Sequence, residues 1–336
     1  MTPGLLIVVP CLNEAVHLPG LLSLLLEEAA PEDVIVVADG GSQDGSPEIV
    51  NELAKRDPRV ILLNNPARLQ SSGLNLAVER FGSDRKYLIR IDAHAGYPEG
   101  FATRLVGAAE ATGADSVVVP MHTVGSSCFQ IAAATAQNSR IGAGGAAHRI
   151  GSESGWIDHG HHALMRLEAF RRINGYDPAF SHNEDADYDL RLGASGGRIW
   201  FQGDLAIDYY PRRTARALFR QYVNYGRGRA RTVVKHRTPL KLRQLAPALV
   251  GPAVAAAATG VLAALLFTPH ALLLAAPALL WLVACLVGGT VAAAASKAPG
   301  CGYLAGLAAM IMHLGWSCGF IAGLAVSGDP RPGAAP

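Results

Sequence analysis

Short aliphatic runs alternate with amphipathic segments along the first part of the chain. Four of these runs predict buried strands, at 5–10, 34–38, 60–63 and 87–91. Leucine or alanine recurs at helical spacing between them, which predicts helices at 18–30, 47–56 and 71–80. A further helix is expected at 101–113, and further strands at 116–120, 198–201 and 206–210. Such alternation with short connections is typical of a doubly wound, largely parallel α/β sheet.

The last part of the chain has a different pattern. Three uncharged hydrophobic segments follow one another, at 245–267, 271–295 and 303–326. Each is longer than the ~20 residues that a helix needs to cross a bilayer, so three transmembrane helices are predicted. Gly315, Gly319 and Gly323 are spaced four apart, a pattern that lets transmembrane helices approach each other closely.

Charge is distributed unevenly, although the formal net charge is only +2. No acidic residue lies between Asp208 and Asp329, and the stretch from Arg212 to Arg243 contains 11 Lys or Arg. A basic run beside hydrophobic segments is typical of a cytoplasmic stretch that faces anionic lipid. Because the hydrophobic segments follow at once, a membrane rather than a nucleic acid is the expected partner. With the basic run inside, the third segment crosses outward and the C-terminal tail lies outside.

These patterns predict four parts. A cytosolic catalytic domain occupies 1–211, a basic amphipathic or interfacial segment 212–243, three transmembrane helices 245–326 and a short tail 327–336. The five cysteines form no CxxC pair, so neither a disulfide framework nor a zinc site is expected, and the soluble part is interpreted as cytosolic and reduced.

Polar residues follow three of the predicted strands directly. Asn13 and Glu14 follow the first strand, Asp39 the second and Asp92 the fourth. In open α/β sheets ligands bind outside the carboxyl ends of the strands, so this edge is the expected active site. The loop that begins Asp39-Gly40 is polar throughout, and its glycines allow close approach of a ligand. The alternative is an ordinary Gly/Asp turn.

Asp92 and His94 form a candidate metal site. In an extended segment, side chains two residues apart project to the same side, so both could reach one divalent ion. Oxygen and imidazole ligands suit Mn²⁺ as well as Mg²⁺. The alternative is a solvent-facing Asp beside a packed His.

A third acidic group lies at 183–189, at an expected helix start. Crowding of Glu184, Asp185 and their neighbours should raise at least one pKa, as a general base requires. The alternative is a helix N-terminus enriched in acids that favourably face the helix dipole. Nearby, His159, His161 and His162 offer either a further metal or diphosphate contact or ordinary packing.

The order of four motifs carries a resemblance. VVPCLNEAVHLPGLL, ADGGSQDGS, RIDAHA and NEDADYDLRLGASGGRIWF, in this order, resemble glycosyltransferase family 2, over about 5–240. WIDHGHHALMRLEAFRRINGYDPAF and RQYVNYGRGRARTVVKH look like the succinoglycan-type membrane glucosyltransferases. The resemblance implies an α/β, Rossmann-like GT-A domain of the nucleotide-diphospho-sugar transferases, followed by an α-helical transmembrane region.

The resemblance also implies roles for residues. Those at nucleotide-sugar-binding positions are Pro10, Asn13, Glu14, Asp39, Gly40, Gln70, Gly73, Asn75 and Asp92. Asp39 matches the carboxylate that holds the base, and Asp185 matches the catalytic base. Asp92 and His94 stand at the DxD position, with His in place of the second Asp, which implies Mg²⁺ or Mn²⁺. Candidates for acceptor or diphosphate contacts are Glu184, Gln221, Tyr222 and Arg227. The segment around Tyr222 fits an interfacial helix equally well.

The expected function is that of a membrane-anchored inverting glycosyltransferase, multi-pass in the inner or plasma membrane, with its catalytic domain in the cytoplasm. It would move a hexose, glucose from UDP-glucose, to a hydroxyl of a lipid-linked or cell-surface polysaccharide. One alternative is transfer to polyprenyl phosphate. Another is a non-catalytic scaffold that binds nucleotide-sugars in an export complex.

Overall fold

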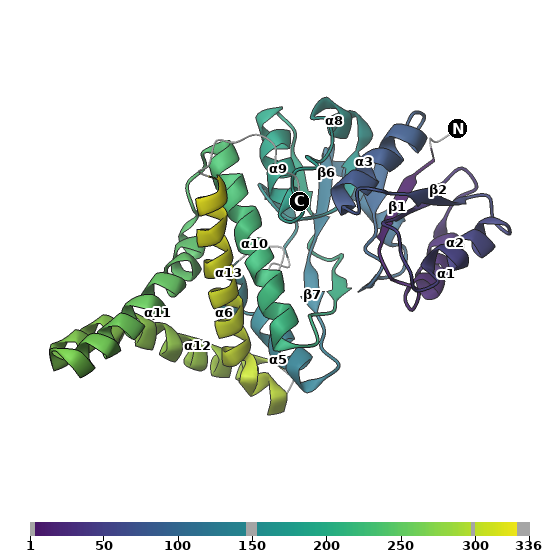
Figure 1. Ribbon diagram of the computed structural model, residues 1–336. Helices are drawn as coiled ribbons and strands as arrows, with labels where there is room; N and C mark the ends of the chain where they lie inside the picture. Colours follow the sequence, from purple (N-terminus) through teal and green to yellow (C-terminus); the bar gives the residue numbers. More distant parts are fainter. Residues whose placement is uncertain (1–3, 146–152, 297–299, 328–336) are drawn as a thin grey trace. The chain divides into compact units, whose positions relative to one another are not determined.

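The computed structural model describes residues 4–145, 153–296 and 300–327. The chain divides into two compact units. One unit comprises Met1–His122 and Gly151–Tyr209, and the other Thr123–Ile150 and Tyr210–Pro336. The first is built around a mixed β-sheet, and the described part of the second is almost entirely helical (Figure 1).

The first unit alternates strands and helices as the hydrophobic pattern predicts. Its elements are β1 (Leu6–Cys11), α1 (Leu18–Glu28), β2 (Val34–Asp39), α2 (Ser46–Ala54), β3 (Val60–Asn64), α3 (Gln70–Phe81), β4 (Tyr87–Arg90), β5 (Ala95–Gly96), α4 (Phe101–Thr112), β6 (Ser116–Val119), β7 (Met121–Thr123), β8 (Gly155–Ile157), β9 (His161–Arg166), α8 (Leu167–Arg172), α9 (Glu184–Ala194), β10 (Ile199–Phe201) and β11 (Ile207–Tyr209). Every strand and helix expected here is present, with ends shifted by at most two residues.

The main sheet has the strand order β3-β2-β1-β4-β9-β6-β10-β8. Its first four strands are parallel, as expected. Strand β9 is antiparallel to both of its neighbours, and β8 is antiparallel to β10. The sheet is therefore mixed, although six of its eight strands run in the same direction. Strand β9 was not predicted because its apolar run, Ala163–Met165, is only three residues long and lies between histidines and an arginine. A smaller sheet has the order β5-β11-β7.

Both faces of the main sheet are covered by helices. Along β1, Ile7 and Val9 join the core that includes α1 and α4, whereas Leu6 and Val8 join the core that includes α3, α8 and α9. This alternation follows from the two-residue repeat of a strand. Because helices close both faces, a ligand reaches the sheet most readily at the ends of its strands.

The second unit consists of helices far apart in sequence. They are α5 (Cys128–Gln137), α6 (Arg140–Ala143), α10 (Ala215–His236), α11 (Leu242–Leu266), the 3₁₀-helix η1 (Pro269–Ala275), α12 (Ala276–Ala295), the 3₁₀-helix η2 (Gly300–Leu304) and α13 (Ala305–Ser327). Three apolar helical stretches are long enough to cross a membrane by length and composition, at Leu242–Leu266, Pro269–Ala295 and Gly300–Val326. They coincide with the three hydrophobic segments of the sequence.

One disulfide bond joins Cys128 at the start of α5 to Cys301 in η2. The expectation of no disulfide framework, and of a reduced soluble part at 1–211, was therefore wrong for Cys128. The two cysteines are 173 residues apart, so no local sequence motif indicates that they pair. Both lie in the second unit. Within the described residues of the first unit, Cys11 is the one cysteine, and it is free and buried.

The glycines spaced four apart on α13 face an unexpected partner. A Cβ atom at Gly319 would collide with the backbone of Val223, and one at Gly315 would lie 2.7 Å from the carbonyl oxygen of Phe219. Both contacts are with α10, not with a second apolar helix. The three glycines were expected to pack against another transmembrane helix, and that prediction was wrong. They do permit close helix packing, but with α10.

Candidate active site

The loops that follow β1 and β2 are locked together by polar side chains. The carboxylate of Asp39 accepts hydrogen bonds from the backbone N–H of Gly41 at 2.9 Å and from the Ser42 hydroxyl at 2.5 Å. Asn13 has a φ of 58° and its side-chain oxygen accepts from the backbone N–H of Gln43 at 2.9 Å. Asp39 is therefore a turn-forming residue at a strand end, whatever it binds in addition. Pro10 lies beside it, paired in register with Ala38 across the sheet.

Of the three residues predicted on α3, Gln70 is the one that bonds to a strand-end acid. Its Nε2 donates to Oδ1 of Asp92 at 3.2 Å. Asn75 instead holds the backbone of Tyr176, through bonds of 2.7 and 2.9 Å. A Cβ at Gly73 would lie 3.1 Å from that of Ala38, so close packing of α3 on β2 accounts for this glycine.

Asp92 and His94 face different partners. Residues 92–95 form a turn, closed by a bond from the N–H of Ala95 to the carbonyl of Asp92 at 3.2 Å. The segment is therefore not extended, contrary to the expectation from the sequence. The prediction that an extended backbone projects both side chains to the same side was wrong. The Nδ1 of His94 lies 2.9 Å from Oε1 of Glu14. The imidazole nearest to Asp92 is that of His161, whose Nε2 lies 3.6 Å from Oδ2.

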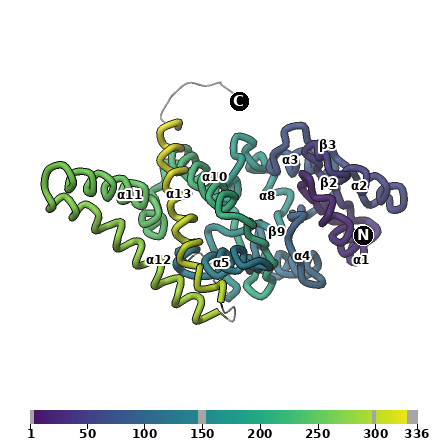
Figure 2. The backbone as a smooth tube through the Cα atoms, turned by 60° about the horizontal axis from the view of Figure 1, so that its bottom comes forward, coloured from purple at the N-terminus to yellow at the C-terminus, as the bar shows by residue number. Residues whose placement is uncertain are grey.

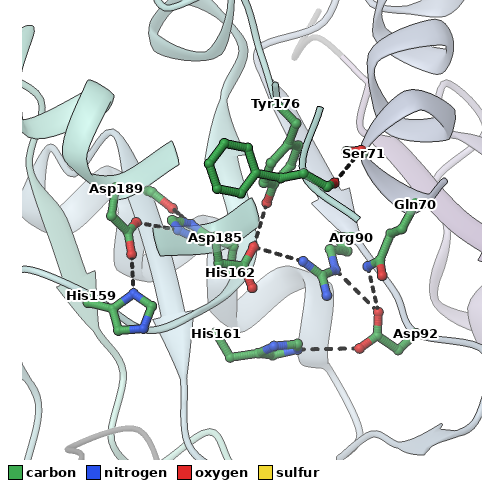
Figure 3. Close-up of polar contacts among 12 residues, drawn as sticks. Gln70, Ser71, Arg90, Asp92, His159, His161, His162, Tyr176, Asp185 and Asp189 are labelled. Carbon is green, nitrogen blue, oxygen red and sulfur yellow. Dashed lines mark hydrogen bonds and ion pairs between the residues drawn. The ribbon is translucent and has the colours of Figure 1, made fainter. Parts of the chain in front are cut away.

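A buried arginine at the end of β4 joins two of the acidic groups (Figure 3). The guanidinium of Arg90 donates through Nε to Oδ1 of Asp92 at 3.2 Å, and through Nη1 to Oδ1 of Asp185 at 2.9 Å. Burial opposes ionisation of Asp92, but the charges of Arg90 and His161 lower the pKa of its carboxyl to about 2. Asp92 is therefore a carboxylate at any physiological pH.

Helix α9 begins at Glu184, as the sequence predicts. Besides Arg90, the hydroxyl of Tyr176 donates to Oδ1 of Asp185, at 3.0 Å. In the described part of the chain, Oδ2 of Asp185 has no hydrogen-bond partner. Burial and the charge of Asp185 raise the pKa of Glu184 to about 7, which confirms that one acid in this crowded group has a raised pKa.

The remaining acids of α9 have internal partners. Asp187 is fully buried and accepts from Nε of Arg191 at 2.8 Å. Asp189 lies 2.6 Å from Nδ1 of His159 and 2.5 Å from Nε2 of His162. Burial opposes a charge on His162, but the carboxylate of Asp189 raises the pKa of this imidazole. These contacts fix the start of β9 and so hold His161 opposite Asp92 (Figure 3).

Comparison with known proteins decides what kind of site this is. A model of the family described as glycosyl transferase family 2 matches residues 6–173, which is half of the chain. The succinoglycan biosynthesis protein ExoA of Rhizobium meliloti (strain 1021) is 51% identical over 313 residues, covering 93% of this chain and 92% of that protein. The chain belongs to glycosyltransferase family 2. It is therefore a glycosyltransferase, as its motifs predict.

More distant similarities agree with this family. The polyprenol monophosphomannose synthase of Mycolicibacterium smegmatis is 32% identical over 127 residues, covering 37% of this chain and 47% of that protein. Among solved structures, the mannosyltransferase PcManGT from Pyrobaculum calidifontis, in complex with GDP-Man and Mn²⁺, has a TM-score of 0.58 at 19% identity. The match covers 96% of this chain and 88% of the mannosyltransferase chain. The predicted GT-A fold is thereby confirmed.

Sequence reasoning missed two polar members of this family 2 site. Arg90 and Tyr176 both donate to Asp185, yet neither stands next to it in sequence. Arg90 does carry a signal, because it is a charged residue at the end of an otherwise apolar buried strand, where a charge requires a partner. Tyr176 carries none that the sequence reveals. His161 was left open between a site contact and packing, and it is the histidine of its group that reaches Asp92.

The donor chemistry at Asp92 fits a divalent ion with few protein ligands. Oδ1 is held by Arg90 and Gln70, whereas Oδ2 faces the imidazole of His161. Among residues 4–145, 153–296 and 300–327, no three His, Cys, Asp or Glu gather closely enough to hold a metal by themselves. One carboxylate oxygen with a neighbouring imidazole suits Mg²⁺ or Mn²⁺, ions that readily take further ligands from a phosphate or water.

Three predicted acceptor residues lie in the second unit, on α10. Gln221 is buried and donates to the hydroxyl of Tyr225 at 3.0 Å. The hydroxyl of Tyr222 accepts from Gln137 at 3.3 Å. Arg227 is exposed, and its backbone packs beside Gly323. Their role in acceptor binding stays a prediction.

Proposed function

We propose that this glycosyltransferase is a membrane-anchored inverting enzyme that transfers a hexose from a nucleotide diphospho-sugar to a hydroxyl of a lipid-linked glycan. Glucose from UDP-glucose is the proposed donor. The observation that supports this best is that Arg90 bonds to two carboxylates. Asp92 is suited to bind a metal–diphosphate group, and Asp185 is suited to act as a general base. The 51% identity to a succinoglycan biosynthesis protein supports an exopolysaccharide product.

Asp185 is the proposed general base. Arg90 and Tyr176 both donate to Oδ1, which leaves Oδ2 available to accept from a substrate. In the proposed reaction Oδ2 takes the proton of the acceptor hydroxyl as that oxygen forms a bond to the anomeric carbon. The bond from this carbon to the diphosphate breaks on the opposite face, and the nucleoside diphosphate leaves. A single displacement of this kind inverts the anomeric centre, through an oxocarbenium-like transition state.

The other residues of the site have proposed binding roles. Asp92, with His161 or His94, would hold the divalent ion, which supplies positive charge to the leaving diphosphate. Asp39 and the loop from Gly40 would contact the base, beside Pro10, Asn13 and Glu14. Gln70 keeps Asp92 in place. Glu184, whose pKa of about 7 leaves it partly protonated near neutral pH, would donate a hydrogen bond to substrate.

The proposed organisation keeps the cytosolic catalytic domain at 1–211 and the basic interfacial segment at 212–243. Hydrophobic helices within 245–326 anchor the protein in the inner membrane, and 327–336 forms the tail. Their length, composition and exposed apolar side chains support this placement.

A second candidate function is transfer of one sugar to polyprenyl phosphate. The similarity to the polyprenol monophosphomannose synthase favours it, although that match covers only 47% of that protein. An already ionised phosphate needs no general base, so this reaction would not depend on Asp185.

A donor screen with membrane fractions tests the proposal. Membranes that contain the full chain are supplied with radiolabelled UDP-glucose, UDP-galactose or GDP-mannose and with MnCl₂ or EDTA. We expect UDP-glucose to label the lipid-extractable glycan fraction, with an inverted anomeric configuration and no transfer in EDTA. A retained configuration would overturn the displacement mechanism, and undiminished transfer in EDTA would overturn the metal site.

A further inference from the structure

Helices α10 and α13 pack side by side and run in the same direction (Figure 1). Gly315 of α13 lies against Phe219 of α10, and further along the pair Gly323 lies against Arg227 and Ala230. Residue numbers rise together along both helices, so the pair is parallel. Gly226 of α10 in turn lies against the backbone of α13 at Trp316. The small residues of both helices thus serve this one contact.

This parallel contact conflicts with three membrane crossings. Helix α10 ends at His236 and α11 begins at Leu242. The five residues between them span at most about 18 Å, too little for a bilayer core of about 30 Å, so both ends lie on one side. With three crossings α13 would end on the far side. Yet the last turns of α10 lie beside the last turns of α13, which would place the end of α10 on the far side as well.

A fourth crossing by α10 does not remove the conflict. Successive crossings alternate in direction, so α13, three helices after α10, would then be antiparallel to it. In addition, α10 presents exposed basic residues on one face, namely Arg216, Arg220, Arg227, Arg231 and Lys235. Charged side chains at the centre of a bilayer are costly, whereas at its surface they face anionic lipid favourably.

The exposed face of α13 is apolar, whereas that of α10 is basic. Leu307, Ile311, Leu314 and Ile321 recur at helical spacing, are exposed or half-buried, and belong to a helix without a charged side chain among its described residues. Protein covers the other side of α13: 33% of the apolar stretch within Gly300–Val326 is buried, against 11% within Leu242–Leu266 and 6% within Pro269–Ala295. Helix α13 therefore exposes one apolar stripe, and protein covers its other side.

Helices α11 and α12 are arranged differently. The hydroxyl of Ser317 on α13 contacts α11 through the N–H of Gly251 and the carbonyl of Ala248, each at 2.9 Å. Trp281 of α12 donates to His313, about one turn earlier on α13, at 3.2 Å. From these contacts both helices leave α13 on one side and meet at η1, as Figures 1 and 2 show. They form a hairpin that is exposed along most of its length.

We infer that α10 and α13 together form a surface that lies flat on the anionic face of the bilayer, and that the α11–α12 hairpin alone enters it. The chain then crosses twice, and α13 and the C-terminus lie on the same side as the start of α11. This topology goes beyond the proposed function, because transfer chemistry does not depend on it.

Depth measurements on the full chain test the inference. Nitroxide labels are placed singly by Leu307→Cys, Leu314→Cys and Ile321→Cys in a Cys318→Ser background, in phosphatidylethanolamine–phosphatidylglycerol vesicles. A spanning helix would separate the outer two labels by about 21 Å in depth and place the middle one deepest. We expect all three at one shallow depth. A profile with Leu314→Cys deepest would overturn the inference.

A topology reporter provides an independent readout. Alkaline phosphatase, which is active only outside the cytoplasm, is fused after the C-terminus of the full chain and, as a control, after Thr268 at the end of the first hydrophobic helix. We expect the control fusion to be active and the full-length fusion to be inactive. An active full-length fusion that still transfers sugar would overturn the topology while leaving the proposed function intact. If the unfused chain itself transferred no sugar, that result would instead count against the proposed function.

Discussion

Arg90 donates to Asp185 at 2.9 Å although the two residues are 95 positions apart in sequence. The same guanidinium also holds Asp92, at 3.2 Å, and its side chain is only 5% exposed. One buried cation thus compensates two carboxylates with different proposed tasks, a metal–diphosphate site and a general base. Because both carboxylates are only partly exposed and Arg90 itself is buried, this cation stabilises the site and the fold of the first unit together.

Replacing Arg90 by methionine should therefore destabilise the protein strongly. Breaking a buried ion pair by removing one partner costs about 3–5 kcal/mol, because the remaining charge is left uncompensated. We expect Arg90→Met to lower the melting temperature in detergent by many degrees and to abolish transfer. Arg104→Gln is the matched control, since Arg104 pairs with Asp204 at 2.8 Å on the surface and the pair should contribute about 1 kcal/mol or less. Equal melting temperatures for both variants would contradict the bridge.

Asp185→Asn should remove the proposed base without moving the backbone. The asparagine oxygen still accepts from Arg90 and Tyr176, but it takes no proton from the acceptor. We expect kcat to fall by about 10²–10⁴, the usual contribution of general base catalysis, with the affinity for UDP retained. Tyr176→Phe, which removes one donor to the same oxygen, should cost far less. Near-normal turnover of Asp185→Asn would favour an ionised phosphate acceptor.

Local patterns in the sequence predict the parallel half of the fold, and with it the strand ends that carry Asp39 and Asp92. The rest depends on contacts between distant segments. Strand β9 inserts antiparallel between β4 and β6 and so brings His161 to Asp92, which no spacing rule expresses. The same holds for the disulfide between Cys128 and Cys301 and for the packing of Gly319 on α10. In each case tertiary pairing, not local periodicity, decides the neighbour.

His161→Ala tests whether the imidazole beside Asp92 helps to hold the metal. Loss of one ligand near a carboxylate should raise the Mn²⁺ concentration for half-maximal transfer at least about tenfold, by analogy with other metal-site substitutions. His94→Ala should have a smaller effect if His94 mainly contacts Glu14, as its 2.9 Å distance indicates. His122→Ala, at an exposed position beside Asp208, serves as the control and should leave the metal titration unchanged. Identical titration curves for His161→Ala and the control would remove His161 from the metal site.

Glu184→Gln should change how stability depends on pH. Burial and the Asp185 charge raise the pKa of Glu184 from 4.5 to about 7 in the folded state. Between these values the unfolded chain loses the proton while the folded chain keeps it, so the free energy of unfolding falls as pH rises through this window. Glutamine carries no such proton. The melting temperature of the variant, relative to that of the unmodified protein, should therefore increase from pH 5 to pH 8, measured in one detergent and salt, and level off above the folded pKa. A constant difference across this range would show that Glu184 is ionised in the folded protein.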